Sequence, residues 1–218
     1  MTDGELAQLI QDCPVLYHMA QHGAWPEIER HGLLSTSALL DLHGVQGAAR
    51  EAVEGARRPG LVAVGTAVVR DQGPMTDAGL HRCLTGGMVP ADWYRLLNGM
   101  TFFWLSGKRL QRLLGAVPYR DQWHDVLELD TAALVAACRV GIRLSAIISG
   151  ATRTFPVPRG PGTFLPIKDY PYAYWRQRRP RWDRVVELTV ADGVPDVARF
   201  VRRVTAMRAG GPAPYALV

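Results

Sequence analysis

The chain has 218 residues, of which 48% are hydrophobic, and it carries a formal net charge of +5 at pH 7. This length favours one domain, and no apolar run approaches the roughly 20 residues that a membrane-crossing helix needs, which excludes a helical membrane protein. Three widely spaced cysteines without a CxxC motif, and an acidic N-terminus without an apolar core, predict a cytoplasmic protein that holds no metal.

Capping residues, helix breakers and hydrophobic periodicity place the helices. Ser106 and Asp130 are good N-caps, and Gly115 ends the helix that Ser106 begins. The predicted helices cover residues 5–10, a segment from Pro26, a segment up to Leu42, and residues 46–57, 78–84, 90–97, 107–114, 131–138 and 195–207.

Alternating apolar residues predict strands at residues 15–19, 61–70, 100–105, 125–129, 142–148 and 185–190. Residues 152–162 hold three prolines and two glycines and are expected to form a loop. Helices and strands mix without strict βαβ alternation, so the predicted class is α+β. We expect one domain over residues 1–208 and a mobile tail at residues 209–218.

The segment from Leu16 to Leu40 is the first of three motifs. A short strand carries His18, with Leu16 expected on the same face and Tyr17 on the other. A helical segment then returns the chain to a Gly-Leu-Leu-Ser turn. A lone histidine near a strand end is more often a hydrogen-bonded structural residue than a ligand contact, and both interpretations stay open here.

An acidic residue in an apolar strand is the second motif. Alternation in residues 185–190 places Val186, Leu188 and Val190 on one face and Glu187 on the other. Either this is an edge strand with one wet face, or the carboxylate faces a cleft.

The third motif is the aromatic run Thr101-Phe102-Phe103-Trp104, followed by a serine at a helix start. Such a strand is usually part of a core. Phe102 and Trp104 share one face and Phe103 takes the other, so alternation alone leaves open which of them meets a ligand.

Together the three motifs resemble the ADP-ribosyltransferase fold, and its DarT-like branch in particular. The similar features are the tyrosine-histidine strand with its glycine-leucine turn, the aromatic strand, and a late glutamate followed by a valine-proline turn. The chain departs from the usual pattern in one place, where phenylalanine stands instead of tyrosine. The resemblance implies an α+β fold with a split antiparallel or mixed sheet flanked by helices.

The resemblance also implies roles for individual residues. Glu187 would stabilise the positive charge that develops on ribose when NAD loses nicotinamide, and His18 would bond a ribose hydroxyl of NAD. NAD is thus expected as a co-substrate, without a metal. The other predicted NAD contacts are Tyr17, Ser35, Thr36, Phe102, Phe103, Trp104 and Ser106.

A catalytic arginine is expected after the first helices in the DarT-like pattern. Arg50 on a predicted helix and Arg70 at a strand end are the two candidates. Arg70 is preferred because a polar loop follows the apolar strand, and loops of that kind often line sites.

Residues 168–184 interleave aromatic and basic side chains directly before Glu187. This composition is typical of a single-strand nucleic-acid surface, and equally of a loop that packs its aromatics and solvates its arginines. The predicted substrate contacts are Tyr170, Tyr172, Tyr174, Trp175, Arg176, Arg178 and Arg179.

The implied function is transfer of ADP-ribose from NAD to a base of DNA or RNA, as in a toxin or defence enzyme with an antitoxin partner. Two alternatives stay open. One is a non-catalytic domain of this fold that binds nucleic acid or protein. The other is an NAD-consuming enzyme whose acceptor is a protein, a small molecule or water.

Overall fold

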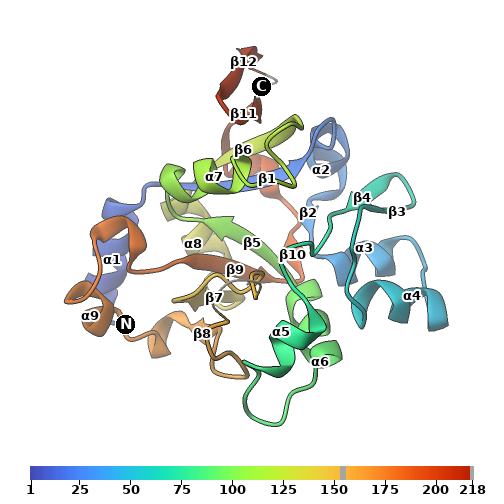
Figure 1. The fold of residues 1–218 in the computed structure, drawn as a ribbon. Helices are drawn as coiled ribbons and strands as arrows, with labels where there is room; N and C mark the ends of the chain where they lie inside the picture. The colour runs from blue at the N-terminus through green and yellow to red at the C-terminus, as the bar shows by residue number, and fades with distance from the viewer. Residues whose placement is uncertain (153–155, 217–218) are drawn as a thin grey trace.

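The computed structural model describes residues 1–152 and 156–216. One large sheet runs through it, in the strand order β12-β11-β6-β1-β5-β9-β7-β8, and every neighbouring pair is antiparallel (Figure 1). Its strands are β1 (Val15–Gln21), β5 (Met100–Trp104), β6 (His124–Asp130), β7 (Ile142–Ser145), β8 (Leu165–Pro166), β9 (Glu187–Ala191), β11 (Val201–Arg208) and β12 (Gly211–Ala216).

Two short strand pairs lie outside this sheet, β2 (Leu33–Leu34) with β10 (Gly193–Val194), and β3 (Val62–Val64) with β4 (Ala67–Val69). The helices are α1 (Asp3–Asp12), α2 (Trp25–His31), α3 (Thr36–Leu42), α4 (Gly47–Glu54), α5 (Asp77–His81), α6 (Pro90–Asn98), α7 (Gly107–Leu114), α8 (Thr131–Cys138) and α9 (Tyr172–Arg176). Short 3-10 turns are η1 (Ile167–Asp169), η2 (Arg181–Asp183) and η3 (Val197–Arg199). The predicted α+β class is confirmed.

Side chains alternate across the sheet, as the period of a strand requires. On β1, Leu16 enters the main core, which includes Leu134 of α8. Met19 faces the other way and packs with Leu110 and Leu114 of α7. The sheet is therefore covered by α8 on one face and by α7 on the other.

The predicted N-caps bring two helices to their expected bounds. The Ser106 hydroxyl accepts a hydrogen bond from the Arg109 N–H at 3.4 Å, and the Asp130 carboxylate accepts one from the Ala133 N–H at 2.8 Å. The helices at residues 107–114 and 131–138 are confirmed. Because a cap satisfies backbone groups locally, short sequence windows suffice to predict it.

The predicted helix at residues 195–207 is wrong. Only η3 is helical there, and β11 follows and pairs with β6 along most of its length. Val204 and Ala206 are buried in the sheet, so long-range pairing overrides the local helical pattern. Residues 211–216, expected within a mobile tail, form β12 and pair with β11.

Glu187 lies on an interior strand. β9 runs between β5 and β7, with Glu187 opposite Trp104 on one side and Ser145 on the other. The edge-strand interpretation of Glu187 is therefore excluded. β1 meets β5 at a single registered pair, Tyr17 and Trp104, so the ladder between these two strands is short.

The described part of the chain contains no helix with the length and apolar character needed to cross a bilayer. Within residues 1–152 and 156–216, no group of three or more His, Cys, Asp or Glu side chains is arranged to hold a metal ion. The predicted loop at residues 152–162 includes residues 153–155, which lie outside the described residues.

Candidate active site

A cavity of about 610 Å³ opens along the short β1–β5 junction. Its volume lies in the range typical of small-ligand sites, roughly 300 to 1,000 Å³. Its walls come from β1, α2, the β2–α3 turn, the β3–β4 hairpin, β5 and α7, and from residues 148–151. Seven of the predicted site residues line it, namely His18, Ser35, Thr36, Arg70, Phe102, Trp104 and Glu187.

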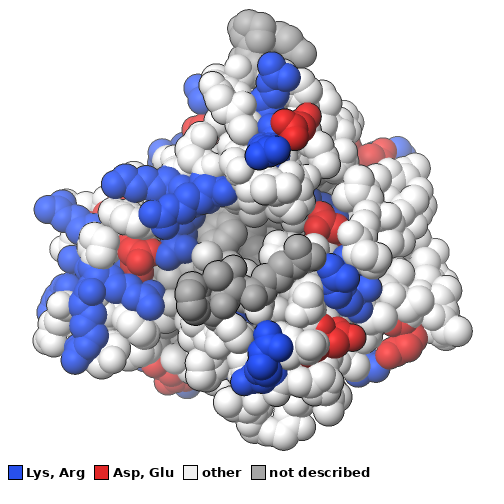
Figure 2. Space-filling model, in the orientation of Figure 1, with Lys and Arg blue, Asp and Glu red and all other residues white. Residues whose placement is uncertain are grey.

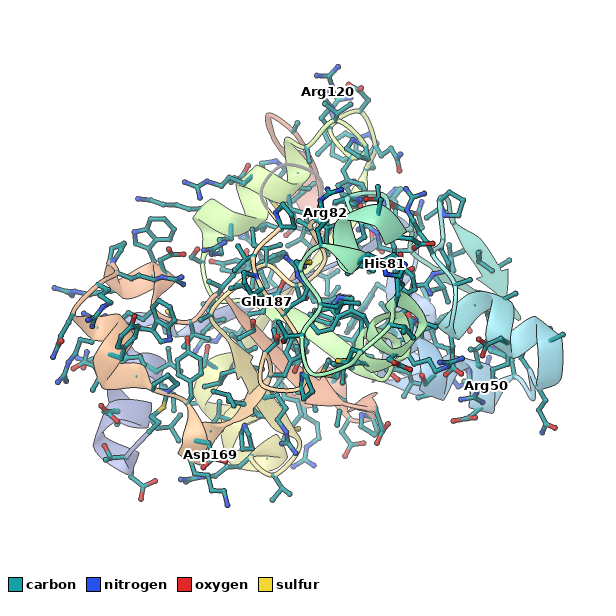
Figure 3. All side chains as sticks on the ribbon, turned by 60° about the horizontal axis from the view of Figure 1, so that its bottom comes forward. Arg50, His81, Arg82, Arg120, Asp169 and Glu187 are labelled. Carbon is teal, nitrogen blue, oxygen red and sulfur yellow. The ribbon has the colours of Figure 1, made fainter. Side chains whose placement is uncertain are left out.

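Glu187 lies near the middle of the molecule, and its side chain reaches the cavity although the residue is only 4% exposed (Figure 3). Its Oε1 accepts a hydrogen bond from the Ser149 N–H at 3.1 Å. Oε2 is buried and has no hydrogen-bond partner among the described residues. A buried acceptor without a partner is costly and rare, so a ligand donor is the natural occupant.

Burial raises the pKa of Glu187 to about 7, while Ser149 and the positive charges of Arg109 and Arg159 oppose that rise. The carboxyl group therefore changes its ionisation near neutral pH. A perturbed acid in a cavity wall is a functional-site signal.

Arg159 holds the turn that bonds Glu187. It is 2% exposed and donates to the carbonyl oxygens of Ser149 at 2.6 Å and Ala151 at 3.0 Å. No motif marked Arg159 in the sequence, because its role depends on carbonyl groups that the fold brings to it.

Arg159→Met should lower the free energy of unfolding by at least about 2 kcal/mol, because three carbonyl groups, of which that of Ser149 is buried, lose a charged donor. Urea unfolding followed by circular dichroism measures this. Arg120→Met is the matched control, since the Arg120 side chain is 54% exposed. Equal unfolding midpoints for the two variants would show that Arg159 does not stabilise the turn at Ser149.

His18 is held by the strand next to it. A carbonyl oxygen can only accept, so the ring Nδ1–H donates to the Phe102 carbonyl at 2.9 Å. Phe103 packs on the imidazole, with ring centroids 5.9 Å apart. Burial lowers the pKa of His18 to about 4, and the positive charge of Arg70 adds to this. His18 is therefore neutral at pH 7, with Nε2 left as an acceptor.

The structure separates the two candidate arginines. Arg70 lines the cavity, donates from Nη1 to the Met19 carbonyl at 3.1 Å, and lies over the Tyr119 ring at 4.7 Å. Arg50 lies on α4 at the outer edge of the molecule, where it pairs with Glu54 and Asp41 (Figure 3). Arg50 is not part of the cavity wall.

Arg109 is a cation that the motifs missed. It lies in the first turn of α7, lines the cavity, is 9% exposed and pairs with Asp183. Its Nε is buried without a hydrogen-bond partner among the described residues. The signal available in the sequence was its place three residues after Ser106, where a helix begins beside the aromatic strand.

The aromatic side chains of β5 point to opposite faces of the sheet, as alternation predicts. Phe102 and Trp104 line the cavity, whereas Phe103 is buried in the main core. Tyr17 packs against the cluster formed by Met19 and the α7 residues Leu110 and Leu114, and Ser106 caps α7. Neither Tyr17 nor Ser106 lines the cavity. Ser35 caps α3 by accepting from the Ala38 N–H at 3.1 Å, and lies in the cavity wall together with Thr36.

The basic and aromatic segment also divides in two. Tyr170 and Tyr172 are buried in the main core, and the Tyr170 hydroxyl donates to the Arg184 carbonyl at 2.6 Å. They are thus structural rather than surface residues, because both rings are buried in the core.

The rest of the segment lies at the surface, although Trp175 is partly buried against the main core and Arg179 donates to the Ala146 carbonyl at 2.6 Å. Arg178 lies 3.7 Å from the centroid of the Tyr174 ring, and Arg179 lies 4.0 Å from that of Trp175. Arg176 is exposed beside them. Basic side chains gather on the side of the molecule where α7 and α9 lie (Figure 2). None of these five residues lines the cavity.

The comparisons with known proteins give one match. Residues 14–201 match the model of a family of unknown function (DUF7002). No curated protein and no solved structure matches the chain. The matched range includes β1, β5 and β9, and hence His18, Phe102 and Glu187. Since it covers most of the sequence, the chain belongs to the DUF7002 family.

Proposed function

We propose that this protein is an NAD-dependent ADP-ribosyltransferase whose acceptor is a base of a nucleic acid. The observation that supports the proposal is that His18, Phe102 and Glu187, from three strands far apart in the sequence, line one cavity. The family resemblance seen in the motifs assigns NAD contacts to the same three side chains. The short β1–β5 ladder agrees with a split sheet.

Glu187 supplies the central chemistry in this proposal. When the bond between ribose and nicotinamide breaks, nicotinamide leaves with the electron pair and positive charge develops on the ribose. The ionised carboxylate stabilises that charge in a site with little water. Its unpartnered Oε2 is the atom available to a ribose hydroxyl. The acceptor nitrogen or oxygen then bonds the anomeric carbon, and its proton goes to Glu187 or to solvent.

The other cavity residues bind and orient. Nε2 of the neutral His18 accepts a hydrogen bond from a hydroxyl group. Phe102 and Trp104 offer aromatic surface to the nicotinamide ring. Arg70 and Arg109 supply positive charge for phosphate groups.

A nucleic acid is favoured as the acceptor by the exposed part of residues 168–184. Two arginines lie over Tyr174 and Trp175, and Lys108 lies 4.9 Å from the ring of Trp182. Aromatic rings stack on unpaired bases and basic groups hold phosphates. This surface leads directly into β9, which carries Glu187.

The test is to incubate the purified protein with NAD and quantify nicotinamide release, with and without single-stranded DNA or RNA. Release stimulated by nucleic acid supports the proposal. Neither NAD binding nor release would favour a non-catalytic binding domain. Release that nucleic acid leaves unchanged would favour a protein, a small molecule or water as the acceptor.

His18→Ala should raise the KM for NAD about tenfold, because one hydrogen bond between uncharged groups is lost in a buried site. Steady-state nicotinamide release measures this effect. His81→Ala is the matched control, since His81 lies on α5, is exposed and does not line the cavity (Figure 3). A KM unchanged by His18→Ala would remove His18 from NAD binding.

Arg178→Gln should weaken binding of single-stranded DNA and reduce the salt dependence of log K by about one phosphate contact. Fluorescence anisotropy at several salt concentrations measures both. Arg199→Gln serves as control, because Arg199 lies on η3 and pairs with Asp196. Equal salt slopes for Arg178→Gln and the unmodified protein would show that Arg178 contacts no phosphate.

A further inference from the structure

We propose that the cavity has a second polar subsite, formed by His22, Asp125 and Glu27, that binds the hydroxyl groups of a ribose without a 2′-phosphate. The subsite lies at the end of the cavity away from Glu187. The inference rests on the proposed function, since it assigns this subsite to the second ribose of the dinucleotide.

The first observation is a histidine that a buried carboxylate holds. Asp125 on β6 is fully buried, and its Oδ1 lies 2.8 Å from Nδ1 of His22. Its Oδ2 accepts a hydrogen bond from the Trp25 N–H at 3.1 Å, at the start of α2. Burying a carboxylate costs several kcal/mol unless both oxygens are satisfied, and here both have donors.

The consequence is an imidazole ring held in one orientation at the cavity wall. The side chain of His22 is 42% exposed and lines the cavity. With Nδ1–H donated to Asp125, Nε2 is the ring nitrogen left to hydrogen-bond a ligand hydroxyl, which can both donate and accept. A buried carboxylate that holds Nδ1–H sets both the tautomer and the ring orientation, as in catalytic histidine–aspartate pairs.

Glu27 adds a second acceptor to this end. It lies in the first turn of α2 and lines the same cavity. Its Oε2 accepts a hydrogen bond at 2.7 Å from the Thr66 hydroxyl in the β3–β4 turn. An imidazole nitrogen and a carboxylate suit a pair of hydroxyl groups, and the carboxylate repels a phosphate group.

Three polar side chains of the cavity wall are arranged in order along β1. His18 lies on the strand, Arg70 reaches it from outside by bonding the carbonyl of the next residue, Met19, and His22 follows the end of the strand. The cavity therefore presents a histidine that can bind a hydroxyl group, then a cation, then a second histidine that can bind a hydroxyl group. A dinucleotide carries the matching series of ribose, diphosphate and ribose.

The spacing excludes His22 from the reaction centre. Glu187 and Tyr17 are joined through Trp104, so two strand spacings of about 4.8 Å separate their strands. His22 lies five residues beyond Tyr17, which adds roughly 17 Å along β1 at about 3.3 Å per residue. His22 is therefore a binding residue rather than a catalytic one.

The experiment compares NAD with NADP, and ADP-ribose with its 2′-phosphorylated form, by steady-state kinetics and isothermal titration calorimetry. The unmodified protein should prefer the unphosphorylated ligand at least about tenfold, the loss expected from one unfavourable charge contact. His22→Ala should raise the KM for NAD and the Kd for ADP-ribose about fivefold to tenfold, with kcat within about twofold. Glu27→Gln should reduce the preference for NAD over NADP, because it removes the negative charge that repels the 2′-phosphate.

Glu29→Gln is the matched control for Glu27→Gln, since Glu29 lies on α2, is exposed and does not line the cavity. Suppose that the protein turns over NAD, and that neither His22→Ala nor Glu27→Gln changes nucleotide binding or the preference for NAD over NADP. That result would overturn the subsite and leave the proposed function standing. If His22→Ala weakens ADP-ribose binding but the unmodified protein releases no nicotinamide from NAD, the subsite is supported and the proposed function is overturned. Failure to bind any of these nucleotides would overturn both.

Discussion

Glu187→Gln should lower the rate of nicotinamide release from NAD at least about a hundredfold. Glutamine keeps the size of the side chain and can still accept the hydrogen bond from the Ser149 N–H. It cannot carry the negative charge that stabilises the developing positive charge on ribose. Loss of one electrostatic contact of this kind typically costs about 10²- to 10³-fold in kcat.

The measurement is single-turnover nicotinamide release at pH 8, where Glu187 is ionised. Asp169→Asn is the control, because it removes one exposed negative charge far from Glu187 (Figure 3). Near-ultraviolet circular dichroism of each variant shows whether the fold is retained. If Glu187→Gln turned over as fast as the unmodified protein, Glu187 would play no part in the chemistry.

The same residue should make folding stability depend on pH. Burial raises the pKa of Glu187 from 4.5 to about 7, so the folded state binds the proton more tightly than the unfolded state does. The stabilising contribution is complete below pH 4.5 and is lost as pH rises through 7. A rise of this size corresponds to about 3 kcal/mol, most of it between pH 5 and pH 9.

We therefore expect Glu187→Gln to gain about 2 to 3 kcal/mol relative to the unmodified protein on going from pH 5 to pH 9. Urea unfolding of both proteins at the two pH values measures it, with Asp169→Asn as control. The prediction is independent of catalysis, because it needs only a buried carboxyl group. Parallel pH dependence in the two proteins would show that Glu187 is not buried in this way.

The two predictions for Glu187→Gln have opposite directions, and together they test the site. The rate of nicotinamide release should fall, whereas the free energy of unfolding at high pH should rise relative to the unmodified protein. A residue selected for packing alone would lose stability on substitution without a pH-dependent gain. An acid kept in a low-dielectric wall at a cost to stability is the expected signature of a functional group.

Local elements were largely predictable from the sequence. Ser106 and Asp130 begin helices because capping involves residues only three positions apart. Alternation in residues 15–19 and 100–104 assigned faces correctly for Leu16, Met19 and Phe103. These predictions succeeded because the period of a strand is a property of the backbone alone.

Other elements depended on partners distant in the chain. Residues 201–208 have enough helical character to suggest a helix, yet they extend the sheet beside β6. Arg50 and Arg70 were both plausible until the fold placed one on the outside of α4 and the other in the cavity wall. Arg159 and the His22–Asp125 pair had no local signal, since their partners lie on other elements.

The sequence by itself determined the α+β class, most helix and strand positions, and the three motifs that carry His18, Phe102 and Glu187. Only the tertiary structure decided that these side chains share one cavity, that Glu187 is interior, and that the charges of Arg109 and Arg159 act on its pKa. The physical reason is range: capping and alternation act over a few residues, whereas burial, pairing and pKa depend on every element that folds against a group.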